Sequence, residues 1–273
     1  MTLSRADADY VRDLVRKRSA IVLPGSKDDL IESRLAPVAR QNGLASLEEL
    51  VVRLRRERNG PLRDLVVDAM TANDPAFFSD LGLWQALEDT ILPELFSRNA
   101  DQRSATFWSA GCSSGQEPYS LAILLVDRFP QILPTWNIRI LATDLSSEML
   151  GRAAAGRYTQ REVDRGLPAR LLVTHFRRTG AMWQVGDRLR EMVEFRAIDL
   201  VRPWPFVPEV DLLFLRNVLI SFDPGAKREI LARCRATLRT GGQLILGSSE
   251  TPLTVDEGFE PMVQGPATTY RPK

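Results

Sequence analysis

The sequence contains few of the residues that build disulfide frameworks and metal sites, and it lacks long apolar runs. Its 273 residues include a single histidine, His175, and two cysteines, Cys112 and Cys234, which are far apart in the chain. These numbers argue against a disulfide scaffold and against a zinc enzyme, because zinc sites need clustered His and Cys ligands. No run of about 18 apolar residues is present, so we expect no membrane insertion.

An excess of charge of one sign is also missing. The chain has 36 Lys and Arg against 35 Asp and Glu, which gives a formal net charge of +1 at pH 7. There is thus no overall electrostatic argument for a nucleic-acid partner or an anionic lipid surface. The first residues, MTLSRADADYVRD, contain no apolar segment of the signal-peptide type, so we expect a cytoplasmic protein.

Apolar residues recur at helical spacing through residues 1–70. The segments LPGS at 23–26 and NG at 42–43 and 59–60 are typical helix stops, and SLEE at 46–49 places Ser and Glu at capping-box spacing. The pattern predicts a small all-helical N-terminal domain of short amphipathic helices.

Beyond about residue 86, apolar β-branched runs alternate with helical stretches around 117–129, 146–155 and 225–239. The runs are ATFWSAG (105–111), IRILATD (138–144), VEFRAIDL (193–200), DLLFLRN (211–217) and GQLILGSSE (242–250). Several are apolar almost throughout, as expected of parallel strands that are covered on both faces. The alternation predicts an α/β domain over residues 86–273, preceded by a linker at 71–85.

Glycines and polar residues follow the predicted strands, where parallel sheets bind their ligands. These positions are Gly111, Gly115, Glu117, Asp144, Asp199, Arg216 and Asn217. A carboxylate that ends the second strand can accept from both hydroxyls of a ribose, so Asp144 points to an adenosine ligand. Glu117 would repel phosphate at a helix start but suits an amino or sulfonium group, which favours S-adenosylmethionine over a dinucleotide.

Simpler interpretations of the same residues stay open at this point. The glycines can merely permit a tight turn, and Asp144 can cap the helix that begins in LSSEML. Arg216 and Asn217 can tie a loop to the sheet edge. Phe77 and Phe78 are candidates for the core, with one ring facing each way.

Five ordered motifs give the sequence a specific resemblance to one family. They are MTANDPAFFSD (70–80), FWSAGCSSGQEPYSLA (107–122), ILATDLSSEML (140–150), LRNVLISFD (215–223) and TGGQLILGSSET (240–251). Over nearly its whole length the chain resembles the CheR family, the chemotaxis methyltransferases that move a methyl group from S-adenosylmethionine to glutamate side chains of chemoreceptors.

The resemblance implies a Rossmann-like S-adenosylmethionine methyltransferase domain and a linker that contributes to the cofactor site. It places the cofactor contacts on Asn73, Glu117, Asp144, Asp199, Leu200, Arg216 and Asn217, beside Gly111 and Gly115. S-adenosylhomocysteine would be the product. Because a glutamate with an ordinary pKa of about 4.3 is already ionised at neutral pH, the transfer needs placement rather than a general base.

Several positions depart from the pattern of the resembled family. Pro75 and Ser79 stand where the family commonly has Thr and Arg, Ser221 stands where it has Tyr, and Asp199 replaces Asn. Ser79, Arg216 and Ser221 are therefore candidates for lining the active site, and no catalytic residue is assigned. The departures leave two alternatives to an active enzyme of this family: an impaired module that binds S-adenosylmethionine or S-adenosylhomocysteine, or a methyltransferase with another substrate.

Residues 175–198 predict a small antiparallel β flap. In the resembled family such a flap, when its loop is longer, docks a receptor-tail peptide, but the turn RTGAM at 178–182 is short. We expect that the flap captures no receptor-tail peptide. We also expect the protein to be a monomer that binds the cytoplasmic helical region of a chemoreceptor-like protein. The basic residues expected to make that contact are Arg16, Lys17, Arg18, Arg53, Arg55, Arg56 and Arg58.

Overall fold

The computed structural model describes residues 3–19, 23, 28–57, 60–71, 75–248 and 250–273. Asn73 and Arg58 lie outside the described residues. The chain divides into two compact units, which are treated separately below. The helical unit comprises Met1–Asn73 with Ile220–Lys227, and the sheet unit comprises Asp74–Leu219 with Arg228–Lys273.

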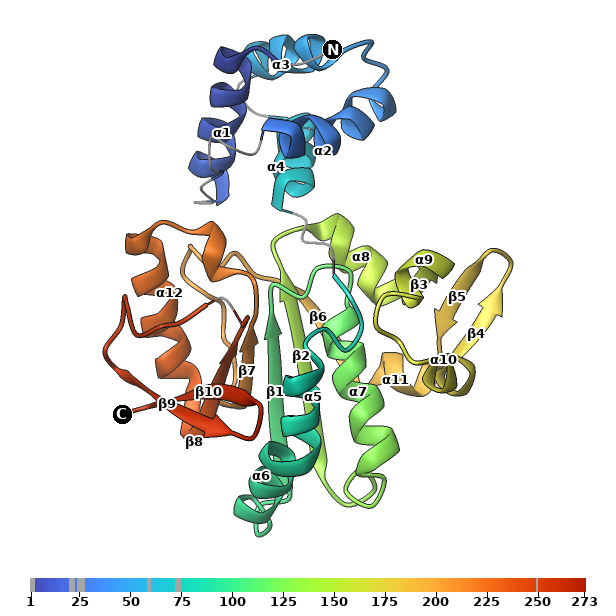
Figure 1. The fold of residues 1–273 in the computed structure, drawn as a ribbon, viewed down its shortest axis with the longest axis vertical. Coiled ribbons are helices and arrows are strands. Elements are labelled where there is room, and N and C mark those ends of the chain that lie inside the picture. Colours follow the sequence, from blue (N-terminus) through green and yellow to red (C-terminus); the bar gives the residue numbers. More distant parts are fainter. Residues whose placement is uncertain (1–2, 20–22, 24–27, 58–59, 72–74, 249) are drawn as a thin grey trace. The chain divides into compact units, whose positions relative to one another are not determined.

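The helical unit confirms the predicted all-helical N-terminal domain. Its helices, blue to cyan in Figure 1, are α1 (Arg5–Ser19), α2 (Asp28–Gln41), α3 (Leu47–Arg56) and α4 (Pro61–Thr71). Their buried stripes form the core of this unit, with Val11, Val15, Ile31, Leu35, Leu50, Leu54 and Val66 fully buried. The apolar residues at helical spacing therefore form the faces through which these helices pack.

The start of α3 shows how far the predicted capping box holds. Ser46 is the N-cap, and its Oγ accepts a hydrogen bond from the backbone N–H of Glu49 at 3.2 Å. The carboxylate of Glu49 accepts from the N–H of Ala45 at 2.8 Å, one residue before the cap. The side chains of SLEE thus fix the helix start, but in a variant of the reciprocal box.

The sheet unit contains the predicted α/β fold. Its strands in the main sheet are β1 (Ser104–Ala110), β2 (Asn137–Asp144), β6 (Val193–Ala197), β7 (Val210–Leu215), β8 (Leu238–Leu246), β9 (Phe259–Gln264) and β10 (Ala267–Pro272). Within the described residues the order across this sheet is β6-β2-β1-β7-β8-β10-β9. The pairs among β6, β2, β1, β7 and β8 are parallel, while β10 runs antiparallel to β8 and to β9.

Along the chain, helices separate β1 from β2, β2 from β6 and β7 from β8 (Figure 1). The helices and helical turns after α4 are α5 (Leu81–Ala86), the π-helical turn η1 (Leu87–Ile91), α6 (Leu92–Arg98), α7 (Gln116–Arg128), α8 (Ser147–Ala155), α9 (Gln160–Val163), α10 (Ala169–His175), α11 (Asp187–Glu191), the 3-10 turn η2 (Leu219–Ser221) and α12 (Pro224–Thr237). Strand, crossover helix and parallel strand repeat as in doubly wound sheets.

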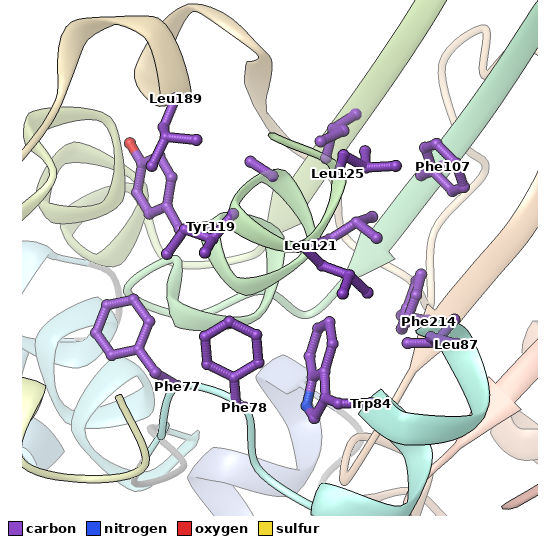
Figure 2. Close-up of a cluster of buried hydrophobic side chains, with 14 of the residues drawn as sticks. Phe77, Phe78, Trp84, Leu87, Phe107, Tyr119, Leu121, Leu125, Leu189 and Phe214 are labelled. Atoms are coloured by element: carbon purple, nitrogen blue, oxygen red, sulfur yellow. The ribbon is translucent and has the colours of Figure 1, made fainter. Parts of the chain in front are cut away.

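The core of the sheet unit is built around α7. Leu121 and Leu125 of this helix belong to the same buried cluster as Phe107 of β1 and Phe214 of β7 (Figure 2). Trp84 of α5 lies in the same cluster, with its ring stacked 6.4 Å from that of Phe214. The packing holds α7 against β1 and β7.

Phe77 and Phe78 are both buried, and they contact different partners as expected. The ring of Phe77 lies 5.1 Å from that of Tyr158. The ring of Phe78 lies 5.2 Å from that of Trp84 (Figure 2). The backbone N–H of Phe78 also donates to Ser120 Oγ of α7 at 3.0 Å. The two rings therefore fasten the segment before α5 to the sheet unit and position Ser79, which follows directly.

A small antiparallel sheet is present, but its extent differs from the predicted flap. Among the described residues it consists of β3 (Arg157–Thr159), β5 (Met182–Val185) and β4 (Phe176–Thr179), in that order. The expected range 175–198 therefore omits β3 and wrongly includes β6, which pairs in parallel with β2 of the main sheet. The reason is burial: Val193 is buried and the Phe195 ring packs 5.8 Å from that of Tyr119 in α7.

Candidate functional site

The topology places a switch point at the carboxyl end of β1, where doubly wound sheets form their ligand crevice. This strand pairs in parallel with β2 on one side and with β7 on the other. The strands that follow β1 in the chain are therefore added first on one side of it and then on the other. Ligands of doubly wound sheets bind at such a switch point. The loop after β1 is tied to the end of β2, because the N–H groups of Gly111 and Cys112 donate to the carbonyl oxygen of Thr143 at 2.7 and 2.9 Å.

Both glycines of this loop are required by their surroundings. Gly111 has φ = +78°, and a Cβ there would lie 2.5 Å from Cγ2 of Val218. Gly115, the N-cap of α7, has φ = +92°, and a Cβ there would lie 2.9 Å from Cβ of Ala153. A left-handed backbone and a close approach coincide at each position, so the Gly-x-x-x-Gly spacing has a physical cause.

Asp144, the last residue of β2, joins the two loops beside the crevice. Its Oδ2 accepts from the N–H of Ser113 at 2.8 Å, and its Oδ1 accepts from the N–H of Ser146 at 2.9 Å. Burial raises the pKa of this carboxyl group, and the backbone hydrogen bonds oppose that shift. The helix cap itself is Ser146, whose Oγ accepts from Met149 N, so Asp144 does more than cap α8.

Glu117 and Arg216 form an ion pair beside the switch point. Glu117 stands in the first turn of α7, and its Oε2 lies 3.1 Å from Arg216 Nη1. Its Oε1 accepts from the hydroxyl of Ser109 in β1 at 2.8 Å. The side chain of Arg216 is 4% exposed and that of Glu117 is 19% exposed, so each charge depends on the other.

Ser79 belongs to the same cluster. Arg216 donates from Nη1 to Ser79 Oγ at 3.0 Å and from Nη2 to the carbonyl oxygen of Ser79 at 3.1 Å. Asp80 Oδ2 lies 3.8 Å from Arg216 Nη2 and adds a second carboxylate. Of the lining candidates the structure thus brings Ser79 and Arg216 together. Ser221 ends η2 and is counted with the helical unit, so it is not part of this described geometry.

Asp199 and Leu200 lie in the loop after β6. The Oδ1 of Asp199 accepts from the N–H of Val201 at 3.0 Å, and its Oδ2 lies 3.2 Å from Nε of Arg202. The side chain of Leu200 is buried. Both carboxylate oxygens of Asp199 therefore hold a local turn, which fixes the direction of the carboxylate.

Asn217 leads to a residue that the sequence interpretation missed. Asn217 has φ = +58°, and its N–H donates to Glu250 Oε2 at 2.6 Å. The same oxygen accepts from the N–H of Gly247 at 2.9 Å, just beyond β8. Glu250 ends the motif GSSE, so inspecting every carboxylate after a strand would have found it. Asp80, next to Ser79, was also missed, and its neighbours in the chain give no separate signal.

Buried polar atoms gather around this crevice. Within the described residues, Ser113 Oγ, Gln116 Nε2 and Arg216 Nε are buried without a hydrogen-bond partner. Such atoms are rare in folded proteins and call for a partner such as water or a ligand. Beside them, burial raises the pKa of the Cys112 thiol well above its usual value, so Cys112 stays protonated. Two carboxylates and a guanidinium around a glycine loop fit a zwitterionic adenosyl amino acid.

Other kinds of site are not supported by the described part of the chain. Within it, no group of His, Cys, Asp and Glu side chains is arranged to hold a metal ion. No helix there is long and apolar enough to span a bilayer. A cavity of about 330 Å³ contains Trp136, Ile138 and Arg188 in its lining, and it lies at the amino end of β2, away from the strand ends described above.

Comparisons with known proteins identify the family of the chain. The sequence pattern of "CheR methyltransferase, all-alpha domain" matches residues 6–71, and that of "CheR methyltransferase, SAM binding domain" matches residues 73–267. A chemotaxis protein methyltransferase of Pseudomonas aeruginosa is 40% identical over 277 residues, covering 100% of both chains. One of Pseudomonas putida is 36% identical with the same coverage, and one of Vibrio parahaemolyticus is 37% identical over 98% of each chain.

The fold and the family matches together define a Rossmann-like, S-adenosylmethionine-dependent methyltransferase with an all-helical N-terminal domain. The chain belongs to the CheR methyltransferase family, and S-adenosylmethionine is its cofactor.

Proposed function

We propose that this chain methylates glutamate side chains in the cytoplasmic helical region of a chemoreceptor-like protein. The observation that carries the proposal is the convergence of Asp144 and the Glu117–Arg216 pair at the switch point of the sheet. The relatives, which are chemotaxis protein methyltransferases by name, support the choice of a chemotaxis substrate. The proposal includes a cytoplasmic monomer that contacts neither nucleic acid nor the membrane interior.

The Glu117–Arg216 pair suits the amino-acid end of the cofactor. That end carries an ammonium group and a carboxylate side by side, and the crevice offers a carboxylate next to a guanidinium. Charge-assisted hydrogen bonds of this kind are stronger than neutral ones. Glu117 keeps lone pairs free after accepting from Ser109 and Arg216, and Arg216 Nε is buried without a partner among the described residues. The pair would thus bind and orient the zwitterion.

The adenosine end is assigned to the neighbouring strand ends. Asp144 accepts one backbone N–H on each oxygen, which leaves further lone pairs for two ribose hydroxyls. Asp199 and Leu200 would border the base. Gly111 and Gly115 allow the backbone to approach the ligand closely, Asn217 completes the rim, and Asn73 of the segment 71–85 is proposed as a further contact.

The chemistry asks the protein for placement. The cofactor supplies a methyl group activated by a positive sulfonium, and the substrate glutamate is an anion at neutral pH. The crevice residues orient the donor, while the buried ring of Phe78 and the surrounding core limit the access of water. Well-oriented intramolecular reactions gain on the order of 7–11 kcal/mol from such positioning. No general base is required.

The test is methyl transfer to receptor fragments. We expect labelled S-adenosylmethionine to yield alkali-labile methyl groups on a cytoplasmic receptor fragment, because glutamate methyl esters hydrolyse in base whereas N-methyl groups do not. A fragment with its candidate glutamates changed to Ala is the substrate control, and Asp144→Ala is the enzyme control. Alkali-stable label would show another substrate class.

A module that binds the cofactor without turnover is the second candidate, and one observation favours it. Both terminal nitrogens of Arg216 are already engaged by Glu117 and Ser79, and no second guanidinium stands at position 79 to receive the incoming carboxylate. Binding of S-adenosylhomocysteine by calorimetry, together with no transfer to any receptor fragment, would select this candidate over the enzyme.

A further inference from the structure

One guanidinium collects the carbonyl oxygens of the loop after β6. Arg233 of α12 donates from Nη1 to the carbonyl oxygens of Leu200 at 2.9 Å and Arg202 at 2.8 Å. Its Nη2 donates to the carbonyl oxygen of Val201 at 3.3 Å and to Glu229 Oε2 at 3.2 Å. Three consecutive carbonyl groups thus converge on a single side chain, which fixes the backbone of residues 200–202.

The same turn determines where the carboxylate of Asp199 points. With their carbonyl groups held by Arg233, Val201 and Arg202 direct their N–H groups back to Asp199, at Oδ1 (3.0 Å) and at the carbonyl oxygen (3.3 Å). Moving the turn would move both donors. The orientation of Asp199 therefore depends on a residue of α12 that does not itself touch the carboxylate.

Trp204 closes the loop and connects it to the ribose side. Its Nε1 donates to the carbonyl oxygen of Leu200 at 3.1 Å, and the Arg233 guanidinium lies 5.8 Å from its ring centroid. The ring packs edge-on against Trp108 of β1 at 5.0 Å. Trp108 in turn donates from Nε1 to Thr143 Oγ1 at 2.9 Å, directly before Asp144. A continuous set of contacts joins the two proposed adenosine acceptors.

We propose that Arg233 is a positioning residue for the base of the cofactor: it holds the 199–204 loop so that Asp199 accepts from the exocyclic amino group of adenine. This assignment rests on the proposed function of the site. A carboxylate at a fixed position accepts from the amino group of adenine but meets the carbonyl oxygen of hypoxanthine with repulsion. A rigid loop therefore discriminates between the two bases, and a loosened loop discriminates less.

The test compares two ligands and two arginines of the same helix. Arg233→Met removes the three hydrogen bonds that Arg233 donates to the loop carbonyl oxygens, whereas Arg235→Met removes a guanidinium that pairs with Asp256 instead. By calorimetry we expect Arg233→Met to weaken S-adenosylhomocysteine about tenfold and to lower its preference over S-inosylhomocysteine by a similar factor. Arg235→Met should change neither, and Arg233→Lys should recover part of the preference.

A second measurement needs no ligand. Amide hydrogen exchange at Val201 and Arg202 should be faster in Arg233→Met than in the wild type, and unchanged in Arg235→Met. Faster exchange with an unaltered preference between the two ligands would overturn the positioning role, and so would unaltered exchange. A wild type that binds neither ligand, yet shows the expected exchange pattern, would overturn the proposed function of the site and with it the assignment of the base.

Discussion

At the scale of single residues, the site places ionisable groups where their charge costs free energy. The carboxyl group of Asp144 has a raised pKa because burial disfavours its ionised form. Ionised Asp144 thus destabilises the folded state at neutral pH, and this cost disappears as the pH falls through the raised pKa. Residues that weaken the fold in this way are typical of binding sites rather than of structural ion pairs.

The first prediction follows from the sign of that shift. Protonated Asp144 loses acceptor capacity, so the affinity for S-adenosylhomocysteine should fall as the pH is lowered, starting above the usual aspartate pKa of about 3.9. Calorimetric titrations between about pH 7 and pH 4.5 test this. Asp144→Asn should bind more weakly at neutral pH but with a flatter profile. A wild-type affinity that stays constant over this range would contradict the assignment of Asp144.

Other titrating groups affect stability in the opposite direction. The pH dependence of stability therefore differs from the pH dependence of ligand affinity. Hydrogen bonds and ion pairs with His175 and Arg170 outweigh burial and lower the pKa of Asp127, and Arg139 lowers that of Glu194. A lowered pKa gives stability that is present at neutral pH and lost as the pH falls toward that pKa. The melting temperature can therefore fall on acidification, although the contribution of Asp144 itself becomes less unfavourable.

At the scale of elements, Gly115 in the loop between β1 and α7 and Gly180 in the turn between β4 and β5 form a matched pair of glycines. Gly115 and Gly180 both have positive φ, at +92° and +62°. A Cβ at Gly115 would lie 2.9 Å from Ala153 Cβ, whereas a Cβ at Gly180 would meet nothing within 4 Å. Substituting Ala at either position costs backbone strain, but only Gly115→Ala adds a clash with α8.

The second prediction uses this difference. Gly180→Ala should lower the free energy of unfolding by about 1 kcal/mol, the ordinary cost of a left-handed residue with a Cβ. Gly115→Ala should cost about 1–3 kcal/mol more, because overpacking is added. Urea unfolding measures both, and calorimetry should show a weaker S-adenosylhomocysteine affinity for Gly115→Ala alone. Equal losses of unfolding free energy in the two variants would mean that α8 shifts to accommodate the new methyl group without destabilising the fold, which would contradict the prediction.

Elements that bury regular apolar patterns were the ones that the sequence could predict. The helices at 117–129, 146–155 and 225–239 correspond to α7, α8 and α12 within two residues at each end. The strand β3 escaped because it is three residues long and carries only one buried residue, Tyr158. A pattern of period two needs more residues than that to be recognised.

The same limit applies to the site. Strand-end logic finds Asp144, Glu117 and Arg216, because each follows an apolar run. It does not reveal that Arg216 binds Ser79 and Glu117 at once. Ser79 precedes Arg216 by 137 residues and Glu117 precedes it by 99, so neither contact is visible in a local pattern. Arg233 was also beyond reach, because its partners are carbonyl oxygens, and backbone groups leave no trace in side-chain patterns. That residues 71–85 contribute to the cofactor site stays a prediction.

At the scale of the whole molecule, the remaining question is which surface meets the receptor. Among the basic residues of α3, Arg53 pairs with Glu57 at 2.9 Å, and Arg55 pairs with Asp7 at 2.8 Å while lying over the Tyr10 ring. Arg56 is exposed and forms no ion pair with a described residue. Arg178 of β4 has the same properties on the small sheet. These two arginines are therefore suited to matched charge-reversal substitutions.

The third prediction is that the receptor is met through Arg56. Reversing an exposed, unpaired cation changes the surface potential without breaking an internal contact, so the fold should be retained. We expect Arg56→Glu to weaken binding to an acidic helical receptor fragment at low salt, and the difference from wild type to shrink as salt rises, because exposed charges are screened with a Debye length of about 8 Å at physiological ionic strength. Arg178→Glu should bind as the wild type does. Fluorescence anisotropy at two salt concentrations measures both variants, and a receptor-tail peptide should not compete. The reverse pattern, with Arg178→Glu impaired and the tail peptide competing, would move the docking surface to the small sheet and show that a two-residue hairpin turn is long enough to capture a peptide.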